Sequence, residues 1–276
     1  MKTKTVLLLI LSFSFFSKNY GFDQQAYEKA ISGEDGIYLG EQDLSDANTE
    51  EYNLIGINLQ NAILSKAKLQ YSLINNANLR EIKGYKSNFF KANLTDANLE
   101  EADLKKAIFN QAILIHTNFC KADLTDASFS ISDIENPWYK FKRSIQKLKY
   151  EFGIVSKPKY YSEYPNCIGA NFQEAIANNT KFQNLLLINA NFKGADLTNA
   201  KFNNSILVNA DFSDVKSFRG TDLRGTNLYK AKFHNANLEG IIVDNVVFYQ
   251  VEGLTESQKE YLIKNGAIFY LSLIHI

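Results

Sequence analysis

The 276-residue sequence has few of the residues from which catalytic and metal sites are usually built. It contains two cysteines, three histidines and one methionine. It shows no metal-spaced Cys/His cluster, phosphate-binding loop or nucleophile elbow. His116, His234 and His275 are scattered along the chain, and two cysteines cannot make a disulfide framework. We therefore expect no catalytic residue, no cofactor and no bound metal.

The sequence also carries no net charge, because Lys+Arg and Asp+Glu each total 30. The distribution is uneven: residues 23–134 carry 17 acidic and 10 basic side chains, whereas residues 135–171 carry 7 basic and 3 acidic ones. The overall balance says nothing about a charged partner, and it gives no reason to expect a nucleic-acid partner.

Long hydrophobic runs are missing except near the N-terminus. Lys2 and Lys4 precede an apolar run of about a dozen residues that ends at Phe16, which suits a secretory signal and is too short to span a bilayer. We expect residues 1–21 to be a signal peptide and the mature protein to be soluble and exported, either periplasmic or secreted. Small residues for cleavage, Ser17 and Gly21, lie in weak contexts. An uncleaved anchor and a buried N-terminal strand or helix therefore stay open.

What the sequence does have is a period of five residues. Residues 92–107 read ANLTDANLEEADLKKA: a small residue, a polar one, an apolar one and two mostly polar ones. We call the apolar residue the centre. Fourteen of the fifteen centres from Leu64 to Ile134 are Leu, Ile or Phe, with Gly84 as the exception, and Ala, Ser or Thr lies two positions before fourteen of them.

A second tract of the same period runs from Phe172 to Phe248. One step in it is six residues long, from Phe212 to Phe218, and this predicts a bulge or a widened corner. A period of five fits neither the 3.6 of a helix nor the 2 of an ordinary strand. It requires a chain that turns inward once per unit and buries its apolar column only by stacking on the next coil. Each buried centre then contributes about 1.5–3 kcal/mol.

The pattern resembles the pentapeptide-repeat family, whose consensus A(D/N)Lxx is matched by Ala97-Asn-Leu and Ala122-Asp-Leu. The resemblance implies an all-β fold, a right-handed quadrilateral β-helix with four units per coil, over residues 37–134 and 166–250. About nine coils would make a rod of roughly 40–45 Å at the sheet spacing of about 4.8 Å. Centres twenty residues apart would then stack. The expected structural centres include Leu69, Phe89, Leu94, Leu99, Leu104, Phe109, Phe129, Phe172, Phe192, Phe212 and Phe233.

Residues 135–165 interrupt the period and predict a basic amphipathic helical insertion. Apolar residues from Trp138 to Phe152 recur at helical spacing, with lysines and an arginine between them. The helix could pack on the solenoid wall, or it could bind a partner protein or a membrane surface. The candidate partner-binding residues are Trp138, Lys140, Phe141, Arg143 and Lys147.

The two ends of the solenoid need caps, because open coil ends are strand edges. Residues 22–36 are expected to form an N-terminal cap within an acidic region. Residues 251–276 are expected to form a short C-terminal helix cap and an apolar tail. Thr255 and Gln258 make a capping box, and Gly266 is a plausible stop. The tail is either a final strand or a dimerisation surface, so a homodimer stays open.

The two cysteines occupy different positions in the repeat. Cys120 follows a centre and should point outward, whereas Cys167 fits a centre and should point inward, so whether they pair depends on the coil phase across the insertion.

Two functions fit the pattern. The first is a non-enzymatic, exported scaffold that binds another protein through the solenoid wall and the insertion. The alternative comes from the resemblance: some pentapeptide-repeat proteins mimic DNA and bind DNA gyrase, a topoisomerase, conferring quinolone resistance. That role requires a dense negative surface and a cytoplasmic location.

Overall fold

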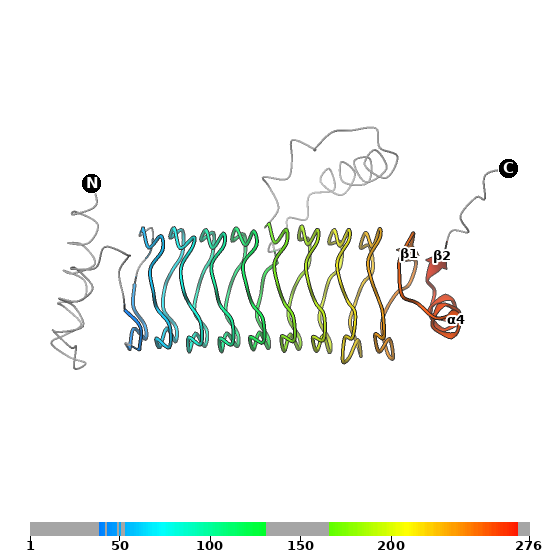
Figure 1. Ribbon diagram of the computed structural model, residues 1–276, viewed down its shortest axis with the longest axis horizontal. Helices are drawn as coiled ribbons and strands as arrows, with labels where there is room; N and C mark the ends of the chain where they lie inside the picture. Colours follow the sequence, from blue (N-terminus) through cyan, green and yellow to red (C-terminus); the bar gives the residue numbers. More distant parts are fainter. Residues whose placement is uncertain (1–38, 42, 49, 51–52, 131–165, 270–276) are drawn as a thin grey trace, which may run out of the picture.

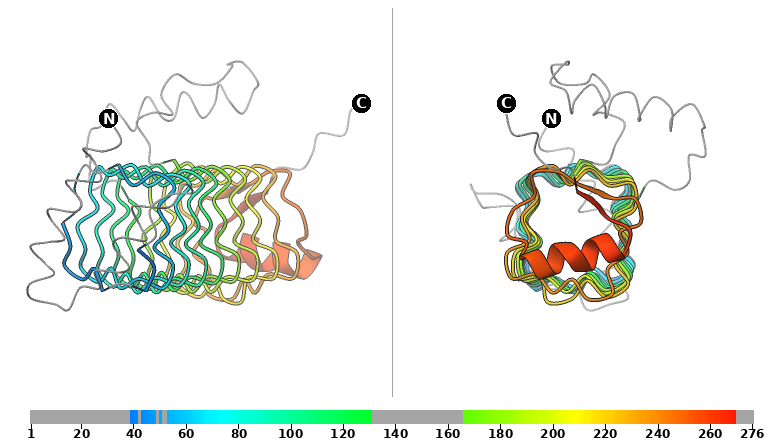
Figure 2. Two further views of the ribbon diagram at one scale, coloured as in Figure 1. Left: turned by 60° about the vertical axis from the view of Figure 1, so that its left-hand side comes forward. Right: turned by 90° about the vertical axis from the view of Figure 1, so that its right-hand side faces the viewer.

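The computed structural model describes residues 39–41, 43–48, 50, 53–130 and 166–269. Over these residues the chain winds into a stack of similar coils that forms a straight rod (Figure 1), and the view along the rod shows a square cross-section (Figure 2). Successive coils pair through parallel β-bridges between residues twenty apart, such as Asn78 with Asn98 and Asn98 with Asn118. The described part is a quadrilateral β-helix with four five-residue units per coil, as predicted.

The bridging residue lies one position before each centre, and the bridging residues form four faces. We number the faces by the coil that carries residues 103–118: face 1 contains Asp103, face 2 Ile108, face 3 Ile113 and face 4 Asn118. The two residues after each centre form the corner that leads to the next face. Because each face takes one residue per coil, its outward side chains come from positions about twenty apart in the sequence.

The corners share one backbone turn. In the unit centred on Leu94, the amide of Ala97 donates to the Leu94 carbonyl oxygen at 2.9 Å, and Asp96 has a φ of 57°. A positive φ at the third of four residues, with this hydrogen bond, defines a type II turn. Asparagine, which tolerates this conformation better than most residues, often fills the position in the second tract, as at Asn184 and Asn189.

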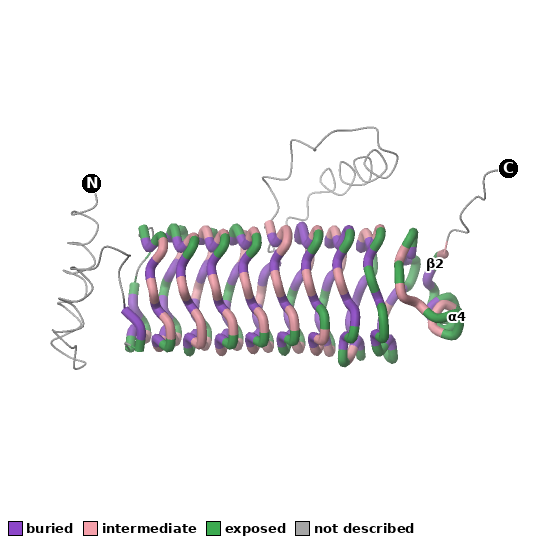
Figure 3. The backbone as a smooth tube through the Cα atoms, in the orientation of Figure 1, coloured by how far each residue is buried: buried purple, intermediate pink, exposed green. Residues whose placement is uncertain are grey.

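The centres and the small residues before them face the inside of the coil and make one continuous core. Buried and exposed positions alternate along every coil as a result (Figure 3). The structure confirms the interior position of the predicted centres, which are no more than 1 % exposed: Leu69, Phe89, Leu94, Leu99, Leu104, Phe109, Phe129, Phe172, Phe192, Phe212 and Phe233.

Phenylalanine rings stack along the axis as the twenty-residue spacing predicts. The ring centroids of Phe89 and Phe109 are 4.8 Å apart, and those of Phe109 and Phe129 are also 4.8 Å apart. In the second tract Phe172 lies 4.8 Å from Phe192. Stacked aromatic pairs of this kind contribute about 0.5–1.5 kcal/mol beyond their burial.

The coil phase across the insertion, which the sequence leaves open, is fixed by the same columns. Phe172 stacks on Phe119 at 5.2 Å, not on Phe129, which instead stacks on Phe182 at 5.0 Å. The β-bridge between Ile113 and Asn166 fits this register. The interval in the sequence is 53 residues where it is otherwise twenty, so the coil after the insertion continues the coil before it.

The one glycine centre is compensated by its own unit. Gly84 lacks a side chain, and the position two residues earlier, normally Ala, Ser or Thr, carries Ile82, which is fully buried. A Cβ atom added to Gly84 would lie 3.5 Å from Ile82 Cδ1 and 3.0 Å from Leu104 Cδ2. The large and the small inward side chains have therefore exchanged places in this unit, and the interior stays filled.

The six-residue step is accommodated at one corner, as predicted. From Asp196 onward the bridges join residues 21 apart, for example Asp196 with Ser217, and the interval returns to twenty at Asp222 with Ile242. The extra residue leaves the aromatic column intact, because Phe212 and Phe233 remain stacked at 5.3 Å.

The last described coil is followed by a helix and a strand. Strand β1 (Val247–Phe248) pairs in parallel with β2 (Ile268–Phe269), and helix α4 (Glu256–Lys264) lies between them in the sequence. The predicted capping box is present: the Gln258 amide donates to the Thr255 side chain, and the Thr255 amide donates to the Gln258 side chain. Viewed along the axis, α4 crosses the end of the rod (Figure 2), and its Leu262 is buried in the core.

Several predicted segments lie outside the described residues. They are the signal peptide (1–21), the N-terminal cap (22–36), the insertion (135–165) and the end of the apolar tail (270–276). Over the part of the chain that the structure describes, no helix is long and apolar enough to cross a membrane.

Candidate interaction surfaces

In the part of the chain that the structure describes, the interior of the coil holds the structural centres. Its polar side chains are mostly hydroxyls that donate to backbone carbonyl oxygens of the coil itself. Thr117 donates to Leu94 at 2.9 Å and Thr180 donates to Leu124 at 2.7 Å. Hydroxyls satisfied in this way stabilise the fold. The side chains that can meet a partner are therefore those on the outer faces and corners.

Groups suited to metal binding or nucleophilic chemistry do not converge. Among the described residues no group of three His, Cys, Asp or Glu side chains could hold a metal ion. His116 and His234 are exposed, as predicted. Cys120 and Cys167 are both free thiols, one partly exposed and one fully buried. Burial raises the pKa of the Cys167 thiol far above its ordinary value, which makes it unreactive.

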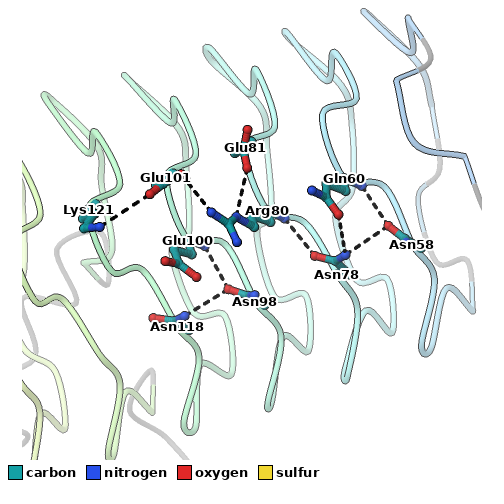
Figure 4. A network of polar contacts seen from close by, with 10 residues as sticks. All are labelled: Asn58, Gln60, Asn78, Arg80, Glu81, Asn98, Glu100, Glu101, Asn118 and Lys121. Carbon is teal, nitrogen blue, oxygen red and sulfur yellow. Dashed lines mark hydrogen bonds and ion pairs between the residues drawn. The ribbon is translucent and has the colours of Figure 1, made fainter.

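Face 4 carries a ladder of asparagine side chains (Figure 4). The Asn118 amide nitrogen donates to the Asn98 side-chain oxygen at 3.0 Å, and Asn171 and Asn191 continue the series at 3.0 Å each. Each of these side chains also accepts from the backbone amide two residues on, as Asn98 does from Glu100 at 3.0 Å. The hydrogen-bonding groups of this face are largely used within the wall.

The corner between faces 4 and 1 carries an ion-pair network (Figure 4). The Arg80 guanidinium contacts Glu81 at 2.9 Å and Glu101 at 3.1 Å, and Lys121 contacts Glu101 at 3.6 Å. The hydrogen bond to Glu101 raises the pKa of Arg80, and the hydrogen bond from Arg80 lowers the pKa of Glu101. These charges compensate one another across neighbouring coils, so the corner presents little uncompensated charge to a partner.

Face 3 and its corner with face 4 carry more apolar outward residues than the rest of the wall, and polar residues such as Asn166 and Asn227 lie between them. We call this surface the apolar strip. On face 3, Ile113 is 41 % exposed and Ile268 is 39 % exposed, whereas Leu186 between them is fully buried. On the corner, Tyr249 is 40 % exposed and its ring stacks on Tyr229 at 5.6 Å. The strip consists of Ile113, Leu186, Ile206, Val247 and Ile268 on face 3, and of Ile115, Ile168, Ile188, Val208, Tyr229 and Tyr249 on the corner.

The predicted partner-binding residues Trp138, Lys140, Phe141, Arg143 and Lys147 lie outside the described residues. The positions that flank their segment are defined, however. Ser130 is the first residue of the corner between faces 2 and 3, and Asn166 is a bridging residue of face 3. The segment therefore leaves the coil at the corner between faces 2 and 3 and re-enters it on face 3, which carries part of the apolar strip. Sequence reasoning missed the strip because its members are separated by about twenty residues; grouping the outward positions by coil would have found it.

The comparison with known families agrees with this architecture. A model of pentapeptide repeats matches residues 43–80, 87–130, 166–204 and 205–245, with eight copies. The chain belongs to the pentapeptide-repeat family. None of the curated proteins searched matches the chain.

Solved structures of pentapeptide-repeat proteins are similar to the chain only at a distance. HetL from the cyanobacterium Nostoc sp. strain PCC 7120, involved in heterocyst differentiation regulation, is 20 % identical with a TM-score of 0.43, over 79 % of this chain and 83 % of HetL. The plasmid-mediated fluoroquinolone resistance protein QnrB1 is 16 % identical with a TM-score of 0.41, over 82 % of this chain and 95 % of QnrB1. Rfr23 from the cyanobacterium Cyanothece 51142 is 29 % identical with a TM-score of 0.32, over 37 % of this chain and 69 % of Rfr23.

Proposed function

We propose that the protein is a non-enzymatic scaffold that binds another protein through its solenoid wall and its 135–165 insertion. The observation that carries this proposal is the apolar strip. Outward positions of the coil are otherwise mostly polar, yet along the strip isoleucine, valine and tyrosine recur from coil to coil. Apolar side chains that recur on the outside of a folded protein are candidates for an interaction site.

A rigid coil suits this role because it holds its outward side chains in fixed rows. The Ile113 and Asn166 backbones pair directly, and Leu186 pairs with Asn166, so strip residues from both tracts are part of one ladder. A partner that matches the row meets a surface already ordered, which lowers the entropy lost on binding. The tyrosines Tyr229 and Tyr249 extend the strip with the residue type that is enriched in protein interfaces.

The insertion belongs to the same proposal. Its apolar side chains, including Trp138 and Phe141, and its basic side chains, including Arg143, are joined to the coil next to the strip. We propose that Trp138, Lys140, Phe141, Arg143 and Lys147 contact the partner together with the strip.

Export is also part of the proposal, since residues 1–21 have the sequence pattern of a signal peptide. N-terminal sequencing of the protein after expression with a C-terminal tag would show cleavage near residue 21, and protein recovered uncleaved in the cytoplasm would contradict it. We also propose that the tail after Phe269 mediates a homodimer. Light scattering would then show a dimer mass for the full chain and a monomer mass after removal of residues 270–276.

The alternative function, DNA mimicry toward gyrase, is not favoured by the charges of the wall. The described residues carry 21 acidic and 19 basic side chains, and at the corner of Arg80 and Glu101 they pair with one another. Such a surface does not produce the dense negative potential that a protein would need to mimic DNA.

The apolar strip offers a matched pair of variants to test the proposal. Ile113 on face 3 and Ile176 on face 1 occupy the same position of their units and are 41 % and 42 % exposed. Quantitative affinity capture from the compartment of the mature protein, with both variants matched in circular dichroism, is expected to show loss of specific partners for Ile113→Glu but not for Ile176→Glu. Equal partner profiles for the two variants would exclude the strip as the binding surface.

A further inference from the structure

Although the chain has no net charge, one side of the solenoid carries many basic and few acidic side chains. Face 2 and its two corners, between the units centred on Leu64 and Leu223, form what we call the basic face. Among the described residues the basic face has ten cationic side chains and two acidic ones, Asp126 and Asp222. The cationic residues are Lys66, Lys68, Lys86, Lys91, Lys105, Lys106, Lys181, Lys201, Arg219 and Arg224.

Several of these cationic side chains are exposed to solvent. Lys105 lies 2.9 Å from Asp123 of face 1, and Arg224 lies 2.7 Å from Asp222. The bridging lysines Lys181 and Lys201 are adjacent along face 2 and exposed. Neighbouring coils are separated by only about 4.8 Å, so these ammonium groups repel one another in the free protein. A surface that brings negative charge to the face would relieve this repulsion.

Aromatic rings flank the lysines on both corners of the basic face. Tyr71 is 47 % exposed and contacts Phe90 edge to face at 5.6 Å, while Lys91 Nζ lies 5.4 Å from the Tyr71 ring centroid. On the other corner Lys86 Nζ lies 5.1 Å from the Tyr85 ring centroid. Since lysine ammonium groups already lie over these rings, the rings are poorly placed to stack on nucleic-acid bases, which is how single strands are held.

We propose that the basic face docks on an anionic lipid bilayer. The face is flat, so lysines from successive coils can reach one plane at the same time, whereas a thread-like polyanion would meet only one row. Each lysine near an anionic membrane strengthens the attraction, and tyrosines at the edges suit the headgroup region. This inference rests on face 2 and its corners and does not use the protein-binding strip on face 3.

The test is co-sedimentation of the full chain with vesicles of phosphatidylcholine alone or with 30 mol % phosphatidylglycerol. We expect binding to the anionic vesicles only, and loss of most of it in 0.5 M NaCl because the attraction is screened. The triple variant Lys68→Glu/Lys181→Glu/Lys201→Glu changes the central row of the face. It is expected to weaken binding at least ~100-fold, given about 1 kcal/mol for each lysine lost.

A control triple, Lys121→Glu/Lys193→Glu/Lys232→Glu, makes the same change in net charge on face 4 and its corner with face 1. It is expected to bind within about threefold of wild type, because these side chains point away from the bilayer. If both triple variants lost vesicle binding equally while circular dichroism showed both to be folded, the attraction would depend on overall charge only, and the proposal would be overturned. Binding to a DNA oligonucleotide or to heparin without binding to anionic vesicles would overturn it as well. So would a Lys140→Glu/Arg143→Glu/Lys147→Glu variant that alone abolishes binding while the face 2 triple leaves it unchanged.

Discussion

The exchange of Ile82 and Gly84 makes the sharpest test of how the coil is packed. Removing the Ile82 side chain by Ile82→Ala empties a fully buried site, which costs about 3 kcal/mol of the free energy of unfolding. Gly84→Leu alone forces a side chain into filled space, since its Cβ would lie 3.0 Å from Leu104 Cδ2 and 3.1 Å from Ser87 Oγ. Overpacking of this kind costs about 2 kcal/mol.

The double variant Ile82→Ala/Gly84→Leu restores the common arrangement of a small residue followed by a large centre. The leucine then occupies the space that the isoleucine leaves, so we expect the double variant to unfold within about 1 kcal/mol of wild type. Independent effects would sum to a loss of about 5 kcal/mol, and the expected coupling is therefore about 4 kcal/mol in favour of the double variant.

Urea-induced unfolding followed by far-ultraviolet circular dichroism measures this cycle. Stacked coils can unfold in parts, so the comparison is valid only where the slope with urea is the same for the four proteins. Ala77→Gly in the preceding unit serves as a control, because its side chain does not share space with position 84. Adding Gly84→Leu should not restore the stability that Ala77→Gly loses. A double variant about 5 kcal/mol less stable than wild type would show that the two side chains do not share one space, and the reasoning would be wrong.

Three further predictions concern thiols, turns and pH. In the native protein a thiol reagent should modify Cys120 but not the buried Cys167, and both should react in denaturant; two fast-reacting native thiols would contradict the interior position of Cys167. Lys106 has a φ of 59°, so Lys106→Gly should raise the free energy of unfolding by about 0.5–1 kcal/mol because a left-handed lysine is strained; a clear loss in urea unfolding would refute this. Burial raises the pKa of Asp222, but hydrogen bonds from the side chains of Arg224 and Asn203 outweigh this and hold the pKa below its usual value. A carboxyl with a lowered pKa stabilises the fold above its unfolded pKa, near 4, and loses this contribution as the pH falls through the folded pKa; Asp222→Asn should therefore make acid unfolding less steep, and an unchanged acid transition would contradict it.

The interior of the coil could be predicted almost completely from the sequence, because its signal is local. A centre such as Leu94 and the alanine before it lie within one five-residue unit, so their inward position follows from the period alone. The capping box of Thr255 and Gln258 is local in the same way. Gly84 was recognised as an exception, but its compensation by Ile82 was not, since that requires knowing that the two side chains point into the same space.

The outer surfaces could not be predicted, because they depend on which residues share a face. Lys68 and Lys181 are more than a hundred residues apart, yet both lie on face 2. Their alignment depends on the phase after the insertion, and stacking of Phe119 on Phe172 sets that phase. Counting charge along the sequence therefore suggested a neutral protein, whereas the folded wall has one basic face and one apolar strip.

By itself the sequence determined the repeating unit: which side chain enters the core, where the chain turns and that the fold must be a stacked coil. A five-residue period leaves no other way to bury one large and one small side chain per unit. Only the tertiary structure decided the outer pattern, because four units make one coil and each face thus collects residues twenty positions apart. The physical reason is that burial constrains every inward residue locally, whereas an outward residue acquires neighbours only when coils stack.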